Sequence, residues 1–453
     1  LHLASRRQRQ MCIRDSRQAK HRRKYDMIVA VVFIGLILIG MPIGFVIGAA
    51  GVCGLVLLGG TSFLAISPSR IFAGLDLFPF LAMPFFILAG EIMNAVGITQ
   101  RLVGLAQALV GRFRGGLAHS NMLASVFFAG LTGSATADAA AFGRTLVPAM
   151  VKAGYRRDYA CAVTAAGSII GPTIPPSGLM VIYGSLMGVS IAGLFAAGIL
   201  PGLAIALVCM GIIVIGGKRE NLPVAERGAT FAEVGEAFKH SLTALFMPVI
   251  ILGGILGGIV TPTEAASVAV AYALFLGAVV YRTLIWRDLY QMLVRTARIT
   301  GVIFVIIAFA NILGFWLTFE RIPQAIAQTV LAVSENPFVI IAIIVTLLLM
   351  IGMIMDITAI LILLAPILVP LTASIGLEPI HAGIIFILAL NISLMTPPVG
   401  ACLFVLSSVT GESVERISIK LFPFLLAQIA ILFVFAFMED AALALPRALG
   451  FAN

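Results

Sequence analysis

Long apolar stretches recur along the chain, and short polar or charged segments separate them. A run of roughly 20 apolar residues can cross a bilayer as a helix. A membrane β-barrel would instead alternate apolar and polar residues with a period of two, which this sequence does not do. The pattern therefore predicts an all-α polytopic membrane protein. The predicted apolar segments are 27–40, 43–59, 78–96, 158–188, 191–216, 241–259, 263–281, 299–319, 380–410 and 418–438.

Two further apolar stretches, 121–150 and 343–372, have polar centres. The first contains the string TGSATAD at 132–138, and the second carries Gly352, Asp356 and Thr358. Apolar arms around a polar tip predict a re-entrant hairpin that enters the membrane and returns on the same side. Three amphipathic segments are expected to form helices at the membrane surface. They lie near 98–114, 286–297 and 321–334.

Proline pairs interrupt two of the long segments. Pro175-Pro176 lies inside 158–188, which Gly171-Pro172 also interrupts, and Pro397-Pro398 lies inside 380–410. A proline inside a helix costs about 3 kcal/mol or more, because it removes an N–H group and clashes with the preceding turn. A simple kink is one interpretation. The other is a discontinuous helix, whose free carbonyls suit Na⁺ and whose free N–H groups suit a carboxylate.

The chain contains an internal repeat with an offset of 222 residues, and no gap is needed over about 65 residues. Proline and glycine are the residues least interchangeable with others in a helix, so their coincidence is informative. The matched pairs are Thr136 with Thr358, Ala137 with Ala359, Pro148 with Pro370, Gly154 with Gly376, Pro175-Pro176 with Pro397-Pro398, Gly178 with Gly400, Ser185 with Ser407 and Pro201 with Pro423.

Charges orient the two copies. Lys152, Arg156 and Arg157 follow the first hairpin, whereas the matching stretch 374–379 carries Glu378 and no Lys or Arg. Cytoplasmic loops are rich in Lys and Arg, so the first hairpin should enter from the cytoplasm and the second from outside. This predicts inverted-topology repeats at 27–240 and 241–440, with both termini outside. Transporters of this kind place their substrate site at the repeat interface.

Composition agrees with a membrane protein, since 61% of residues are hydrophobic and 11% are charged. Most of the net charge of +9 comes from residues 1–26, which carry +7. These residues could form a nucleic-acid or anionic-lipid patch. We expect instead a non-native tail, because MCIRDS is typical of a translated sequencing adapter and Met27 directly precedes the first apolar run. Residues 441–453 are expected to form a C-terminal tail.

The sequence lacks the motifs of ATP hydrolysis, of metal binding and of a catalytic serine. The sequence has no GxxxxGK[ST] phosphate loop, no HExxH motif and no Cys/His metal spacing, and its five cysteines suggest no disulfide framework. Ser177 has no His or Asp partner nearby in sequence, which argues against an intramembrane enzyme. A purely structural scaffold would not need a duplicated polar core.

Asp138 and Asp356, at the predicted hairpin tips, are the acidic candidates for the site. An ionisable side chain at membrane depth is expensive and usually functional. We place Asp356 ahead of Asp138, because Asp138 could instead cap the outgoing helix of its hairpin. Ser and Thr hydroxyls and backbone carbonyls are suitable Na⁺ ligands, although hydroxyls often bond to their own helix. Asn391 could donate to a substrate or to a carbonyl.

Long motifs carry a resemblance to a known family. GSATADAAAFGRTLVPAMVKAGY, AAGSIIGPTIPPSGLMVIYG and VSIAGLFAAGILPGL in the first half, with DITAILILLAPILVP and NISLMTPPVGACLFV in the second, resemble the large DctM-type membrane subunit of tripartite ATP-independent periplasmic (TRAP) transporters. The similarity extends from Met27 to about residue 440.

The resemblance implies an elevator-type carrier of the bacterial inner membrane, with no enzyme activity and with Na⁺ as coupling ion and no other cofactor. A small four-helix membrane subunit and a periplasmic solute-binding protein would be its partners, without nucleic acid. The solute would carry a carboxylate, as a C4-dicarboxylate or sialic acid does. A stand-alone divalent-anion/Na⁺ symporter of the same superfamily is the alternative.

The resemblance also suggests site residues. The predicted Na⁺ ligands are Ser134, Thr136, Gly171 and Thr173 in the first copy, and Gly352, Asp356, Thr358, Met395 and Thr396 in the second. The predicted substrate contacts are Asp138, Pro175, Pro176, Ser177, Asn391, Pro397, Pro398 and Gly400.

Overall fold

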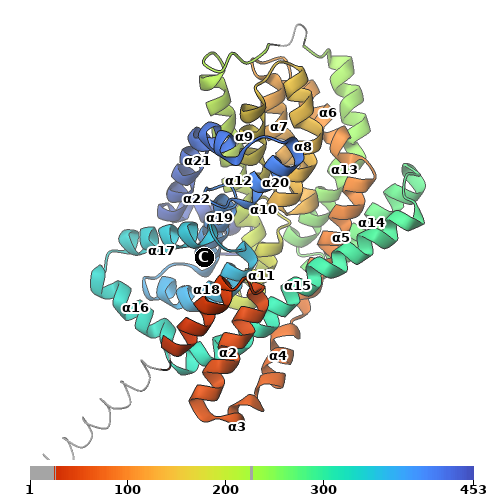
Figure 1. Cartoon of the computed structure of the whole chain (residues 1–453). Coiled ribbons are helices and arrows are strands. Elements are labelled where there is room, and N and C mark those ends of the chain that lie inside the picture. Colours follow the sequence, from red (N-terminus) through yellow and green to blue (C-terminus); the bar gives the residue numbers. More distant parts are fainter. Residues whose placement is uncertain (1–24, 26, 225–227, 453) are drawn as a thin grey trace, which may run out of the picture.

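The computed structural model describes residues 25, 27–224 and 228–452, and every regular element among them is helical (Figure 1). The predicted basic tail therefore lies outside the described residues, apart from Tyr25. A first helix covers 27–38. The others are α2 Ile43–Gly59, α3 Thr61–Leu64, α4 Ser67–Leu75, η1 Phe78–Leu81, α5 Ala82–Ala95, α6 Ile98–Val110, α7 Gly116–Thr132, α8 Ala135–Lys152, α9 Arg157–Ser168, α10 Ile170–Thr173, α11 Gly178–Met187, α12 Ile191–Gly216, α13 Phe231–Leu256, α14 Pro262–Phe275, η2 Leu276–Val280, α15 Trp286–Phe319, α16 Ile322–Val333, α17 Pro337–Gly352, α18 Ile357–Ser374, α19 Pro379–Ser393, α20 Ala401–Thr410, α21 Val414–Phe437 and α22 Glu439–Ala448.

In the described part of the chain, eight helical stretches are long and apolar enough to cross a membrane. The two predicted hairpins form as α7–α8 and α17–α18, and both proline-rich segments are broken helices. The prediction of an all-α polytopic fold with two hairpins and two discontinuous helices is confirmed.

One surface-helix prediction was wrong. Residues 286–297 are the first turns of α15, a single helix of 34 residues. At a rise of 1.5 Å per residue, α15 is about 51 Å long, well beyond the roughly 30 Å of membrane hydrocarbon. Its charged start and its apolar remainder therefore belong to one continuous helix, which crosses the molecule diagonally (Figure 1). The charge pattern indicated the polar environment of 286–297 but not its continuity with the span.

The offset of 222 residues recurs in the helices. α8 covers Ala135–Lys152 and α18 covers Ile357–Ser374, so both ends are shifted equally. Each of these helices starts at an N-cap side chain, Ser134 in the first copy and Asp356 in the second. The repeat therefore describes equivalent backbone elements, including the caps that begin them.

Equivalent helices run in opposite directions. α12 and α21 correspond in the repeat, and the end of α12 meets the start of α21 through an ion pair between Glu220 and Lys420 at 2.7 Å. Near the start of α19, His381 Nε2 lies 2.8 Å from the carbonyl of Phe435, at the end of α21. The ion pair between α12 and α21, which pack together, fits an antiparallel arrangement of these two equivalent helices, as an inverted second copy requires.

The helices form two groups. The first contains α2, α4, α5, α13, α14 and α15, in which α2, α4 and α5 pack along α15. The second contains the hairpins, the broken helices, α12 and α21. α6 lies between α7 and α13, and α16 lies between α15 and α18, so each contacts both groups. Residues 441–448 of the predicted tail are helical and belong to α22, which buries Ala442 and Leu443.

Candidate functional site

The first broken helix is interrupted by a fully buried segment. α10 ends at Thr173, Ile174 to Ser177 have no helical conformation, and α11 begins at Gly178. Residues 171–177 are all buried. Non-helical backbone is tolerated at membrane depth only where protein or water covers it. Here the protein covers it, so this break is an enclosed element and not a lipid-facing kink.

The tip of the first hairpin lies directly on this break. Gly133 ends α7 in a left-handed conformation, with φ of 58°. A Cβ at Gly133 would lie 2.6 Å from the carbonyl oxygen of Pro176, so only glycine allows this approach. Ser134 then caps α8, and its Oγ lies 3.3 Å from Oγ1 of Thr136. Two predicted ligand hydroxyls are thus adjacent at a tip that touches the predicted substrate segment.

Asp138 occupies a different position from the one considered in the sequence. It does not cap α8, because Ser134 does. Its side chain is completely buried, and its Oδ1 accepts a hydrogen bond from the Thr132 hydroxyl. Its Oδ2 packs against Gly171, where a Cβ would lie 1.9 Å away. The buried Asp138 side chain therefore contacts both the hairpin, at Thr132, and the first break, at Gly171.

The two broken helices touch where the repeats meet. Nδ2 of Asn391 on α19 donates to Oγ1 of Thr173 at 3.2 Å, and Thr173 donates to the carbonyl of Ile169 at 2.7 Å. Both side chains are fully buried. The other Asn391 amide atom, Oδ1, is buried and has no hydrogen-bond partner, as is the hydroxyl of Ser177. Both oxygens are therefore free to form a hydrogen bond with a group bound at the breaks.

The second break is more open. α19 ends at Ser393, and Thr396 donates to the carbonyl of Ile392 at 2.9 Å. Gly400, with φ of 48°, is the N-cap residue of α20. Met395 is buried, whereas Pro398 is exposed and Pro397 is partly buried. The hairpin contacts this break through Gly352, because a Cβ there would lie 2.1 Å from Oγ of Ser393.

Asp356 is exposed and caps α18. Its Oδ1 accepts hydrogen bonds from the backbone N–H groups of Thr358 and Ala359, at 3.0 and 3.1 Å. In the described part of the chain, no hydrogen bond joins Asp356 or Thr358 to Met395 or Thr396. The structure thus brings hairpin and break together in both copies. The predicted Na⁺ ligands of the second copy, however, are joined by fewer contacts than those of the first.

Two site residues were missed in the sequence. Thr132 donates to Asp138, and Ser393 packs against Gly352. Ser393 could have been found, because it stands 222 residues after Gly171 and so occupies the same place in the second break. Thr132 has no polar counterpart at Ile354, and only the folded hairpin places it beside Asp138.

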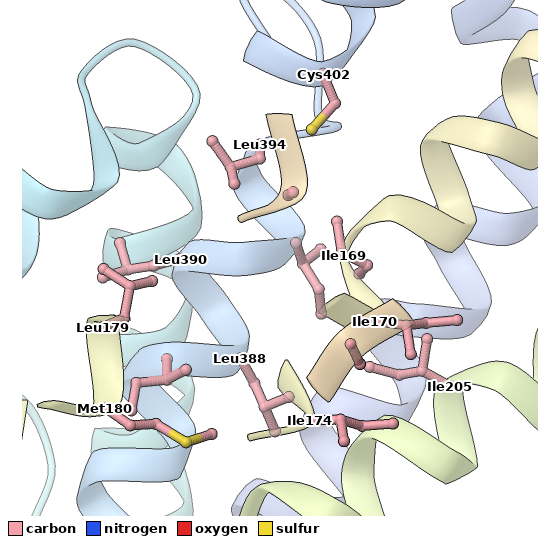
Figure 2. Close-up of a cluster of buried hydrophobic side chains, with 14 of the residues drawn as sticks. Ile169, Ile170, Ile174, Leu179, Met180, Ile205, Leu388, Leu390, Leu394 and Cys402 are labelled. Atoms are coloured by element: carbon pink, nitrogen blue, oxygen red, sulfur yellow. The ribbon is translucent and has the colours of Figure 1, made fainter. Parts of the chain in front are cut away.

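Apolar side chains surround the first break. Figure 2 shows Ile169, Ile170 and Ile174 gathered with Leu388 of α19 and Ile205 of α12. All of these residues are at most 8% exposed. The polar atoms described above therefore lie in a setting with little water, which strengthens their electrostatic interactions.

This architecture matches a known family. A sequence model described as "Tripartite ATP-independent periplasmic transporter, DctM component" matches residues 30–441. The chain belongs to this family. Its members are transporters and not enzymes, and they are multi-pass proteins of the inner membrane. The large permeases of TRAP systems work with a small membrane subunit and a periplasmic binding protein.

Curated relatives cover nearly the whole chain. The sialic acid TRAP transporter large permease protein SiaM of Vibrio cholerae is 39% identical over 420 residues, which are 92% of this chain and 97% of that protein. The 2,3-diketo-L-gulonate TRAP transporter large permease protein YiaN of Escherichia coli is 38% identical over 416 residues, which are 91% of this chain and 98% of that protein. The crystal structure of the Alcanivorax borkumensis YdaH transporter has a TM-score of 0.60 at 14% identity, covers 90% of this chain and 97% of its own, and shows the shared fold.

Proposed function

We propose that this TRAP large permease imports a carboxylate-bearing solute by Na⁺-coupled alternating access. A separate small membrane subunit and a periplasmic binding protein that delivers the solute complete the system. The named substrates of the relatives, sialic acid and diketogulonate, are acids, which supports the substrate class. A C4-dicarboxylate belongs to the same class.

One observation carries the proposal: unpaired buried oxygens lie where the two broken helices meet. Oδ1 of Asn391 and Oγ of Ser177 have no partner in the described structure, although both side chains are fully buried. Leaving such a group unsatisfied costs about 1–3 kcal/mol. A solute or ion that supplies the missing partners regains this free energy on binding.

The coupling ion would bind beside this point in each copy. In the first copy, the hydroxyls of Ser134 and Thr136 would hold Na⁺ with Gly171 and Thr173 of the break. In the second, Asp356 and Thr358 would do so with Met395 and Thr396, and Gly352 would border them. Sodium at a tip draws the hairpin and the break together and adds positive charge near the solute carboxylate.

The carboxylate itself would bind between the two breaks. The N-terminus of α11 begins at Gly178, directly after Pro175, Pro176 and Ser177. Free N–H groups and the helix dipole at such a terminus attract an anion. Pro397, Pro398 and Gly400 would border the solute from the opposite repeat, and Asn391 would donate to it. Asp138, which is as buried as Asn391 and Ser177, would face the same site from the first hairpin.

The movement would be of the elevator type. The hairpins and broken helices would travel together against the group that contains α5, α13, α14 and α15. α6 and α16 contact both groups and would act as the connecting arms. In such a movement the site would be open to one side of the membrane at a time.

The test is uptake of a radiolabelled acid into proteoliposomes that contain this chain, its small subunit and its binding protein. We expect uptake to require an inward Na⁺ gradient and to be lost in Asp356→Ala. Glu378→Ala is the matched control, because Glu378 also caps a helix by accepting from two backbone N–H groups, at 2.7 and 3.0 Å, but lies away from the tip. Uptake that is indifferent to Na⁺, or equal losses in both variants, would refute the proposal.

A further inference from the structure

Thr173 holds the Asn391 side chain in one orientation. A threonine hydroxyl has one proton to donate, and Thr173 donates it to the carbonyl of Ile169 at 2.7 Å. Towards Asn391, 3.2 Å away, its Oγ1 can therefore only accept. Only the NH₂ end of an amide donates, so Nδ2 faces Thr173 and Oδ1 points elsewhere. The hydrogen bonds of the protein thus assign the two ends of this amide.

This orientation determines which hydrogen-bonding group Asn391 offers to a solute. Nδ2 keeps a second proton, whereas Oδ1 is buried and accepts no hydrogen bond from the described residues. An amide oxygen only accepts, so it binds an O–H or N–H donor or a cation. Asn391 presents Nδ2, and not Oδ1, to the predicted Na⁺ ligand Thr173. A donor on the solute is therefore the better match for Oδ1 than that ion.

Donors for the carboxylate of a solute lie at the start of α11. Ser177 is the N-cap residue of α11, but its side chain makes no capping bond and its buried hydroxyl has no partner among the described residues. The first N–H groups of a helix have no partners within that helix. No atom outside its own helix and chain neighbours lies within 4 Å of a Cβ built on Gly178, so there is room beside them. The first copy thus offers donors, and the second offers the acceptor of Asn391.

We propose that the solute is a hydroxy acid, whose carboxylate binds Ser177 and the start of α11 and whose hydroxyl donates to Oδ1 of Asn391. This assignment rests on the proposed function and narrows its substrate class. Succinate carries only acceptors at neutral pH and leaves Oδ1 unsatisfied. A site that bonds a hydroxyl rejects the analogue without it, because a buried polar group then stays unpaired. Thr173 is a positioning residue, since it acts on the solute through Asn391.

Matched acids test the preference on the wild-type chain. The pairs are L-malate with succinate, lactate with propionate, and gluconate with hexanoate. The rise in unfolding temperature of the full chain in lipid nanodiscs with Na⁺, followed over a concentration series, gives an apparent Kd for each acid. We expect the hydroxylated acid to bind about tenfold or more tightly in at least one pair. The absence of such a preference in every pair would overturn the proposal.

Variants of Thr173 test the orientation of the amide. Thr173→Val removes the acceptor that fixes Nδ2, so the ratio of the two Kd values in the preferred pair should fall toward one. Thr173→Ser keeps a hydroxyl and should keep the ratio. A merely structural role of Thr173 would weaken both acids alike. An unchanged ratio in Thr173→Val would therefore overturn the positioning role.

The dependence on Na⁺ separates this inference from the proposed function. If Oδ1 of Asn391 bound Na⁺, Asn391→Leu would raise the Na⁺ concentration needed for binding and weaken both acids of a pair equally, which would overturn the inference. We expect instead that Asn391→Leu abolishes the preference for the hydroxylated acid. A wild-type preference that persists while binding and uptake are indifferent to Na⁺ would refute the proposed coupling and support the assignment of Asn391.

Discussion

The amide of Asn391 donates to the hydroxyl of Thr173 across 218 residues of sequence, at 3.2 Å. The bond joins the two inverted copies at their breaks, and it joins positions that are not equivalent. The counterpart of Asn391 in the first copy is Ile169, and the counterpart of Thr173 in the second is Met395. The contact at the centre of a symmetric fold is therefore asymmetric, so each copy contributes different chemistry to the site.

Removing this bond should destabilise the protein. Thr173→Val takes away the acceptor and leaves the buried Nδ2 of Asn391 unpaired, which we expect to cost about 1–3 kcal/mol. Thermal unfolding in detergent measures the loss. Thr145→Val is the control, because Thr145 bonds only to the carbonyl of Ala141 on its own helix. A double-mutant cycle with Asn391→Ala that shows no coupling energy would contradict the bond.

Gly171 should not tolerate a methyl group. In Gly171→Ala the new Cβ would lie 1.9 Å from Oδ2 of Asp138, so the carboxyl group or the break must shift. We expect destabilisation of about 1–3 kcal/mol, the range of overpacked cores, and loss of uptake. Gly253→Ala is the control, since nothing lies within 4 Å of its Cβ position and alanine favours a helix by about 0.5–1 kcal/mol. Equal stability of the two variants would show that the Asp138 contact is not tight.

The second copy offers a compensating pair. Gly352→Ala should clash with Ser393, whose Oγ would lie 2.1 Å from the new Cβ. Ser393→Gly removes the obstruction and gives the second break the residue that the first has at Gly171. We therefore expect the double variant to recover most of the unfolding temperature lost by Gly352→Ala. If Gly352→Ala is harmless alone, the contact between hairpin and break differs from the one described.

The orientation of the two hairpins can be tested at matched positions. Lys152 and Ser374 are exposed and end the equivalent helices α8 and α18. Because cytoplasmic loops are rich in Lys and Arg, Lys152→Cys should react with a membrane-impermeant thiol reagent only from the cytoplasm, and Ser374→Cys only from the periplasm. The assay compares intact cells with inverted vesicles. Labelling of both positions from one side would exclude the predicted topology.

The sequence determined the architecture because two physical constraints are visible in it. Hydrocarbon demands apolar runs of fixed length, and prolines and glycines mark the places where helical hydrogen bonding must fail. The double prolines at 175–176 and 397–398 thus located both breaks, and the polar tips between apolar arms located both hairpins. The charge at 286–297 misled, because charge reports the surroundings of a segment and not whether its helix continues.

Only the tertiary structure decided how the site is assembled. Asp138 and Asp356 lie at similar places in their hairpins, and local sequence favoured Asp356 as the residue at depth. Packing of α10 and α20 buries Asp138, whereas the tip that carries Asp356 stays exposed. Burial depends on which distant segments cover a side chain, and the bond between Asn391 and Thr173 depends on how two distant breaks meet. Neither relationship is encoded in the spacing of residues along one segment.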